Sequence, residues 1–184
     1  RKPSRSGQRM AQIRSSVSPF NAESGGILRW PGGMARCALG RSGVTPSELK
    51  REGDGASPLG VWPMRQVLYR PDRLKRPETA LPADPMIPEA GWCDDPASLF
   101  YNRPVMLPFA ASHEKLWRED HVYDLLVVLG HNDDPPVPGL GSAIFLHLAR
   151  EDYSPTEGCV ACALPDLLAL LAEARPGDAL EIAR

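Results

Sequence analysis

Short hydrophobic runs alternate with polar turns along most of the chain, and this pattern predicts a fold built mainly from β-strands. The runs 26–30 and 34–39 flank Pro31-Gly32-Gly33, which predicts a hairpin. The nearly continuous Leu and Val residues of 123–130 are typical of a strand that is buried on both faces. Further strands are predicted at 60–69, 142–148 and 179–182.

One clearly helical pattern covers residues 163–174. Pro165 suits a first helical turn, and the leucines that follow it recur at helical spacing. Pro176-Gly177-Asp178 then ends the helix. The sequence therefore predicts a mainly β, β-rich α+β fold in which helix is a minor component.

The stretch 141–162 carries the strongest chemical signal. His147 lies near the end of a predicted strand, and Cys159 follows Gly158 after a polar loop that contains Pro155. A loop of this kind can fold back and bring the cysteine towards the histidine. A thiol with a pKa near ~8.5 is mostly neutral at pH 7, so a nucleophilic cysteine needs a base such as imidazole nearby. The glycine would let a substrate carbonyl approach closely. These residues predict a cysteine nucleophile with a histidine base.

Around the cysteine, the sequence resembles the YkuD-type L,D-transpeptidase family. A histidine on a strand, a loop and then Thr156-Glu157-Gly158-Cys159 before an apolar residue are similar to the family's [S/T]HGC motif. Glu157 stands where most members have histidine, and Ala161 stands where many have arginine or asparagine. Further segments resemble a divergent branch of the family found in proteobacteria, namely ARCALGRSGV, GWCDDP, YNRPV and YDLLVVLGHNDDP.

The resemblance covers roughly residue 26 to the C-terminus and implies how the chain is organised. It implies a mixed β-sandwich with a short helix after the cysteine, formed by residues 26–184. Residues 1–25 contain several Arg and Ser residues and little hydrophobic periodicity, so we expect a flexible basic arm there. Within the domain, the resemblance assigns Cys159 as the nucleophile, His147 as the base and Gly158 as part of the oxyanion site.

The family remodels bacterial peptidoglycan, so the resemblance implies that stem peptides are the substrates. The cysteine would form a thioester with one stem in a ping-pong reaction, and an amine of a second stem would then form a 3-3 or 1-3 cross-link. Attack by water instead would make the protein a peptidase. The resemblance implies no metal or cofactor, a monomer and a periplasmic location, although the chain shows no signal peptide.

Candidate substrate-binding residues lie both inside and outside the motif. Arg73 belongs to a basic cluster, and guanidinium groups bind carboxylates such as those of a stem peptide. The segment 91–113 is long and irregular, and such segments are often functional. The segment 50–63 is expected to be a loop that leads into a strand, and a place in one wall of the groove is its alternative role. The candidates are Arg73, Tyr101, Asn102, Arg103, His113, Glu114, Thr156 and Glu157.

Three alternatives remain from the sequence. Cys159 and Cys162 form a CxxC pair, as in thioredoxin-like redox proteins, but the surrounding pattern lacks the βαβ context of that fold. His113 and Asp120 have the spacing of the first two zinc ligands of some peptidoglycan peptidases, but no downstream ExxH or HxH completes a three-ligand site. The third alternative is a non-catalytic domain that binds the cell wall on the same fold.

Composition limits the partners without naming one. The chain has 184 residues, a formal net charge of −2 and 24% charged residues, which fit one globular domain. This charge balance gives no reason to expect binding to nucleic acid or to a membrane. No apolar run reaches the ~18 residues that a transmembrane helix needs.

Overall fold

The computed structural model describes residues 18–184, and strands dominate this part of the chain. One α-helix, α1 (Leu164–Glu173), and one short 3-10 helix, η1 (Ser47–Leu49), accompany them. This content confirms the predicted β-rich α+β fold and the short helix after the cysteine. The strands are β1 (Asn21–Glu23), β2 (Ile27–Trp30), β3 (Gly33–Ala38), β4 (Val44–Pro46), β5 (Ser57–Tyr69), β6 (Ala83–Pro85), β7 (Ala90–Cys93), β8 (Pro104–Met106), β9 (His113–Lys115), β10 (Leu125–Leu129), β11 (Phe145–Leu148), β12 (Val160–Cys162) and β13 (Ala179–Ala183).

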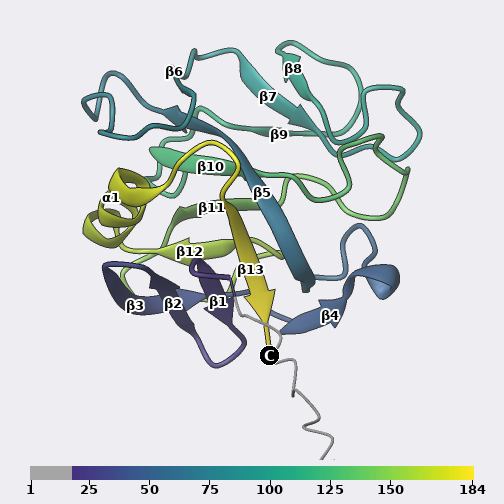
Figure 1. The fold of residues 1–184 in the computed structure, drawn as a ribbon. Helices are drawn as coiled ribbons and strands as arrows, with labels where there is room; N and C mark the ends of the chain where they lie inside the picture. The colour runs from purple at the N-terminus through teal and green to yellow at the C-terminus, as the bar shows by residue number, and fades with distance from the viewer. Residues whose placement is uncertain (1–17) are drawn as a thin grey trace, which may run out of the picture.

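Ten of these strands form one mixed sheet with the order β10-β11-β12-β3-β2-β1-β13-β5-β4, and β6 pairs with β5 beside this path. β5 also pairs with β10, so the order returns to its start and the sheet closes on itself. β5 can join both halves because it is 13 residues long: residues 60–63 pair with β13, and residues 64–69 pair with β10. Figure 1 shows β5 running diagonally across the front of the sheet. The expected mixed sandwich therefore takes the form of two sheet halves that β5 connects.

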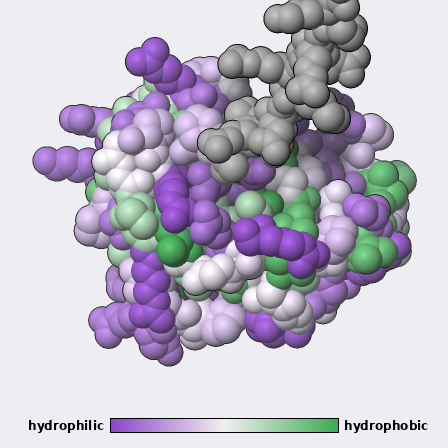
Figure 2. Space-filling view, turned by 60° about the horizontal axis from the view of Figure 1, so that its bottom comes forward, coloured by the Kyte–Doolittle hydropathy of each residue, from purple (hydrophilic) through white to green (hydrophobic). Residues whose placement is uncertain are grey.

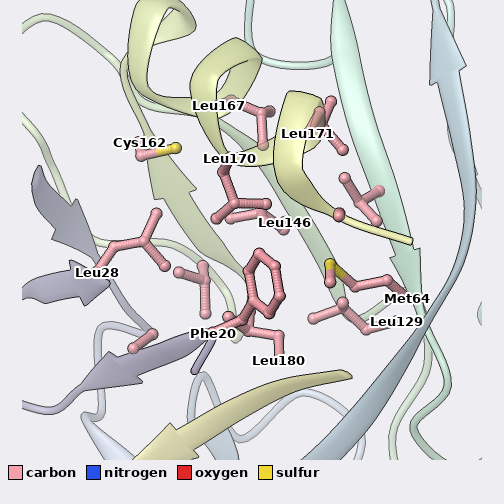
Figure 3. Packing of buried hydrophobic residues seen from close by; sticks show 14 of the residues in the cluster. Phe20, Leu28, Met64, Leu129, Leu146, Cys162, Leu167, Leu170, Leu171 and Leu180 are labelled. Atoms are coloured by element: carbon pink, nitrogen blue, oxygen red, sulfur yellow. The ribbon is translucent and has the colours of Figure 1, made fainter. Parts of the chain in front are cut away.

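The main hydrophobic core ties distant parts of the chain together. Phe20, Leu28, Leu146, Leu170 and Leu180 are each at most 2% exposed and come from five different segments. Figure 3 shows Phe20 among leucines of the sheet and of α1. Burial of one such side chain is worth roughly 1.5–3 kcal/mol. The helix, the N-terminal strands and the C-terminal strand therefore stabilise one another.

The folded part begins earlier than the predicted boundary at residue 26. β1 pairs in parallel with β13 and antiparallel with β2, and Phe20 just before it is buried in the main core. The predicted arm of residues 1–25 is therefore too long, because its last apolar residues pack against a strand from the other end of the chain. Residues 1–17 of that arm lie outside the described residues.

Most predicted elements lie close to their observed bounds. The hairpin forms from β2 and β3, the doubly buried strand is β10, and all five residues of β10 are buried. The strand predicted at 142–148 is shorter, because β11 begins only at Phe145. Ala143 has a φ of +53°, which lies outside the β region and ends the extended conformation before the strand.

A small sheet with the order β8-β7-β9 packs against the main sheet and lies above β10 in Figure 1. A second hydrophobic cluster lies between the two sheets. Within it, the rings of Trp92 from β7 and Phe145 from β11 meet edge to face, with 5.1 Å between their centroids. Cys159 belongs to the same cluster. The small sheet therefore forms one side of the region around the cysteine.

The surface differs from this interior. On the face that Figure 2 shows, hydrophilic side chains separate the hydrophobic areas into small patches. Within residues 18–184, no helix is long and apolar enough to cross a membrane.

Candidate active site

A pocket of about 460 Å³ contains both residues of the predicted catalytic pair, Cys159 and His147. Its volume lies within the range of ~300–1,000 Å³ that is usual for ligand sites. The segment 50–63, for which a wall of the groove is the alternative prediction, contributes Lys50, Glu52 and Gly53 to the lining. Other lining residues include Asp94, Glu114, Arg118, Tyr123, Ser142, Ala143, Arg150, Thr156 and Glu157.

The parallel pairing of β11 with β12 brings the cysteine and the histidine to this pocket. The register places Val160 beside Leu146, so Cys159 comes next to Phe145, whose N–H donates to Sγ at 3.3 Å. His147 lies two residues after Phe145, and alternate residues of a strand point to the same face. The two side chains therefore lie on one face of neighbouring strands. Among the described residues, no hydrogen bond joins them directly.

His147 is positioned to accept a proton through Nε2. Its Nδ1 lies 3.0 Å from the carbonyl oxygen of Leu148, and a carbonyl can only accept, so Nδ1 carries the hydrogen and Nε2 is left as the base. Burial lowers the pKa of His147 to about 4; the Leu148 contact opposes this shift, and the charges of Arg118 and Arg150 add to it. The imidazole is therefore neutral at pH 7.

The sulfur of Cys159 is also neutral and is held by the backbone. Sγ accepts the N–H of Phe145 and donates to the carbonyl oxygen of Ala143 at 3.2 Å. Burial, followed by the negative charge of Glu114, raises the pKa of the thiol to about 12, while the Phe145 N–H and the charge of Lys50 oppose the shift. The resting pair is thus a thiol and a neutral imidazole. Formation of the thiolate requires transfer of the proton to the imidazole.

The turn before the cysteine requires glycine at its third position. Gly158 has a φ of +138°, and a Cβ on it would lie 2.9 Å from the carbonyl oxygen of Ala56. The hydroxyl of Thr156 donates to the carbonyl of Cys159 at 2.6 Å and accepts the N–H of Gly158 at 3.1 Å. Thr156 therefore shapes the turn. The N–H of Gly158 is already engaged, which corrects the expectation that it faces the substrate.

Tyr101 and Asn102, which the sequence analysis assigns to substrate binding, lie behind the pocket wall. The Tyr101 side chain is 2% exposed, and its hydroxyl donates to Glu52 at 2.6 Å. The side-chain oxygen of Asn102 accepts hydrogen bonds from the indole N–H of Trp92 at 2.9 Å and from the backbone N–H of Ala143 at 3.0 Å. Its side-chain NH2 group donates to two backbone carbonyls of the loop after β10. Both side chains therefore support the wall, because their polar groups are engaged inside the protein.

Arg73, His113 and Arg103 do not line the pocket. The Arg73 guanidinium donates to the carboxylate of Asp124 at 2.8 Å and to two backbone carbonyls of the 119–120 segment, so it fastens that segment to the sheet. His113 packs against Phe109 at a separate shallow site, with 6.0 Å between the ring centroids. Arg103 is exposed outside the pocket. The fold therefore turns these three side chains to surfaces outside the pocket that holds Cys159 and His147.

Comparison with protein families agrees with this geometry. Residues 18–182 match the YkuD family, described as the L,D-transpeptidase catalytic domain. The chain belongs to this family. The family acts on peptidoglycan and consists of acyltransferase-type enzymes. The match begins at residue 18, in agreement with the participation of β1 in the sheet. A search of curated proteins and a search of solved structures each found no match.

Glu157, at the usual histidine of the YkuD motif, lies at the edge of the pocket. Its side chain is 78% exposed and pairs with Arg41 at 3.0 Å. It is not among the charges that raise the pKa of Cys159, whereas Glu114 is. In this YkuD domain, the unusual motif residue therefore changes the rim of the pocket more than the environment of the sulfur.

The two cysteines of the CxxC pair lie on opposite faces of the sheet. Cys159 belongs to the cluster beside the small sheet, whereas Cys162 is fully buried in the main core. Residues three apart in an extended segment point in opposite directions, which explains the separation. A redox pair needs its sulfurs close together, so the fold contradicts that alternative. Within residues 18–184, no group of three His, Cys, Asp or Glu residues is arranged to hold a metal ion.

Tyr123 is a pocket residue that the sequence analysis does not single out. Its ring lies edge to face with that of His147, with 5.2 Å between the centroids, and its hydroxyl donates to Glu114 at 3.1 Å. Tyr123 precedes a run of Leu and Val, and its position there indicates only a buried strand. Its contacts depend on β9 and β11 meeting across the second cluster, which no local sequence pattern reveals.

Proposed function

We propose that this protein is a peptidoglycan L,D-transpeptidase that acts through a thioester on Cys159. The observation that carries the proposal is that Cys159 and His147 line one pocket from neighbouring parallel strands, with Nε2 of the imidazole available as a base. Membership of the YkuD family supports the same reaction class.

In the first half-reaction, Nε2 of His147 takes the S–H proton as the sulfur attacks the carbonyl carbon of a donor stem peptide. The C–N bond of the donor breaks, and the imidazolium gives its proton to the leaving amine. The product is a thioester on Cys159. Because the thiol and the imidazole are both neutral at rest, we expect proton transfer and attack to be coupled. The free thiol should then react slowly with ordinary thiol reagents at pH 7.

Backbone donors near the sulfur would stabilise the oxyanion of the tetrahedral intermediate. Thr156 already occupies the N–H of Gly158. The N–H of Cys159 takes part in no hydrogen bond within the described part of the chain, so it is the donor that we assign to the oxyanion. Gly158, without a side chain, leaves room for the carbonyl to reach it.

In the second half-reaction, an amine of a second stem peptide attacks the thioester carbonyl. The C–S bond breaks, the amine proton passes through His147 to the sulfur, and the new amide is a 3-3 or 1-3 cross-link. Attack by water would release a shortened stem peptide. We place this activity in the periplasm, where stem peptides are found.

Mass spectrometry of purified muropeptides incubated with the protein tests this function. The wild type should form new dimers and Cys159→Ala should form none, while fragmentation of the dimers tells 3-3 from 1-3 links. Cys162→Ala is the matched control and should retain cross-linking, because its sulfur lies in the other core. Shortened monomers without dimers would make the protein a peptidase. Absence of both products from the wild type would contradict catalysis on these substrates and favour a binding domain.

A further inference from the structure

The basic side chains of the pocket wall are paired with carboxylates outside it. Lys50 forms an ion pair with Asp54, and its side chain is only 3% exposed. Arg118 and Arg150 both pair with Asp120, at 2.7 Å and 3.4 Å. Neither of these aspartates lines the pocket. The positive charges of the wall are therefore largely neutralised from behind.

Apart from Glu157 at the rim, which pairs with Arg41, the acidic side chains of the wall have only neutral partners. Glu52 accepts the hydroxyls of Tyr101 and Ser142, and Asp94 accepts the hydroxyl of a serine. Glu114 accepts the hydroxyl of Tyr123 through one oxygen, and its second oxygen has no hydrogen bond or ion pair among residues 18–184. A carboxyl group without an ion-pair partner among residues 18–184 therefore faces the pocket from β9.

In the second half-reaction the acceptor amine has to lose a proton before it can attack, and a carboxylate in the pocket can take that proton. An amine with a pKa near ~10.4 is neutral in only about one molecule in 2,500 at pH 7, and only the neutral form attacks a carbonyl. His147 alone would have to bind the acceptor, deprotonate it and then assist the collapse of the intermediate. Its neutral imidazole offers no charge to attract an ammonium group.

We propose that Glu114, held by the Tyr123 hydroxyl, is a further catalytic residue that binds the ammonium group of the acceptor and takes its first proton. This inference rests on the proposed function and deepens it. Tyr123 connects the two ends of the site, because its hydroxyl holds the carboxylate and its ring packs against the ring of His147. Glu114 is also close enough to the sulfur for its charge to affect the thiol.

The electrostatic setting of Glu114 suits a proton acceptor. Burial raises the pKa of Glu114 to about 7. The hydrogen bond from Tyr123 and the positive charge of Arg118 lower this pKa, whereas the negative charges of Asp94 and Glu52 raise it. Glu114 is thus a stronger base than an ordinary carboxylate and is partly ionised at neutral pH. Its uncharged, protonated form after the transfer is tolerated in the same partly buried position.

Glu114 and His147 each take one of the two protons that the acceptor ammonium group loses. The ammonium gives one proton to the Glu114 carboxylate and becomes a neutral amine, which attacks the thioester carbonyl carbon on Cys159. The second amine proton passes to Nε2 of His147, the C–S bond breaks, and that proton goes on to the sulfur. Glu114 then returns its proton to solvent through the open pocket.

The test separates acylation from aminolysis in Glu114→Gln, which keeps the size and removes the charge. Acyl-enzyme formation with a donor stem peptide is followed by mass spectrometry. Free diaminopimelate is then added as the acceptor, and hydroxylamine, which is neutral at pH 7, is added in a parallel reaction. We expect acylation within about threefold of the wild type, aminolysis by diaminopimelate lower by about 100-fold, and an unchanged reaction with hydroxylamine. Raising the pH towards 10 should restore the reaction of diaminopimelate.

Other outcomes decide against the inference in distinguishable ways. Equal aminolysis by the wild type and Glu114→Gln would overturn the role of Glu114 while leaving the thioester mechanism intact. Equal losses with diaminopimelate and hydroxylamine would indicate a structural role and also overturn it. Failure of the wild type to form an acyl-enzyme would overturn the proposed function itself. The matched control is Glu78→Gln, because Glu78 is an exposed acidic residue outside the pocket. This variant should behave as the wild type. Tyr123→Phe keeps the ring and should lower aminolysis more than acylation.

Discussion

Replacement of Gly158 by alanine tests whether the turn before the cysteine sets the geometry of the site. The new Cβ would lie 2.9 Å from the carbonyl oxygen of Ala56, closer than Cβ atoms approach in real proteins. That carbonyl belongs to a buried residue whose N–H is bonded to Asp54, so it cannot easily move away. Overpacking of this kind costs roughly 1–3 kcal/mol. The φ of +138° adds roughly 1–3 kcal/mol for any residue with a side chain.

We therefore expect Gly158→Ala to lower the free energy of unfolding by about 2–6 kcal/mol, measured by urea denaturation. The turn can relieve the clash only by moving the adjacent Cys159, and a displacement near 1 Å can cost about 100-fold in rate. Acylation should fall accordingly. Gly139→Ala is the control, since its φ of +82° imposes some strain but no atom lies within 4 Å of the new Cβ. Equal losses of stability in both variants, with normal acylation by Gly158→Ala, would refute this account of the turn.

Three further predictions address the support of the site. Asn102→Leu should lower the free energy of unfolding by about 3–5 kcal/mol, because it leaves two buried donors and two carbonyls unpaired; a loss below 1 kcal/mol would contradict its supporting role. Arg73→Met should cost about 2 kcal/mol, because it removes the cationic partner of one oxygen of the buried Asp124 carboxylate, whose other oxygen keeps its contact with His121. It should not change KM for stem peptides, and a raised KM with normal stability would support the predicted role of Arg73 as a ligand. Stability should fall as pH falls from about 6.5 to 4.5, because His131 and His147 have pKa values near 4 in the fold and take up protons only on unfolding. Glu114, with its raised pKa, is protonated in the fold but ionised in the unfolded chain over the same pH range, which offsets the proton uptake of one histidine. The net slope of the free energy of unfolding should therefore be about 1.4 kcal/mol per pH unit, measured by urea titrations at several pH values. A flat profile would contradict the burial of the histidines.

The elements that the sequence predicts well are those fixed by local pattern. The run of Leu and Val in 123–130 predicts a strand that is buried on both faces, and all residues of β10 are buried. The hairpin depends on its turn residues, and α1 depends on Pro165 and the spacing of leucines. The parallel pairing of β11 with β12 is not local, but the motif resemblance anticipates its result, since Cys159 and His147 share a pocket.

The residues that the sequence misplaces depend on contacts between distant segments. Asn102 looks like a groove residue in an irregular stretch, yet its amide is satisfied by segments about 30 and 41 residues away. Arg73 looks like a free ligand until the 119–124 segment supplies its partners. The sequence places Phe20 in a flexible arm, but the pairing of β1 with β13 buries it in the main core. Composition and periodicity contain no information about which distant segments meet.

The most direct test of the account is to trap and locate the covalent intermediate. The protein is mixed with a donor stem peptide, quenched in acid within the first turnovers, and digested for peptide mapping by mass spectrometry. We expect an acyl group on Cys159, with none on Cys162 and none in Cys159→Ala. An acyl group at another residue, or cross-linking by Cys159→Ala, would contradict the central claim that this sulfur is the nucleophile.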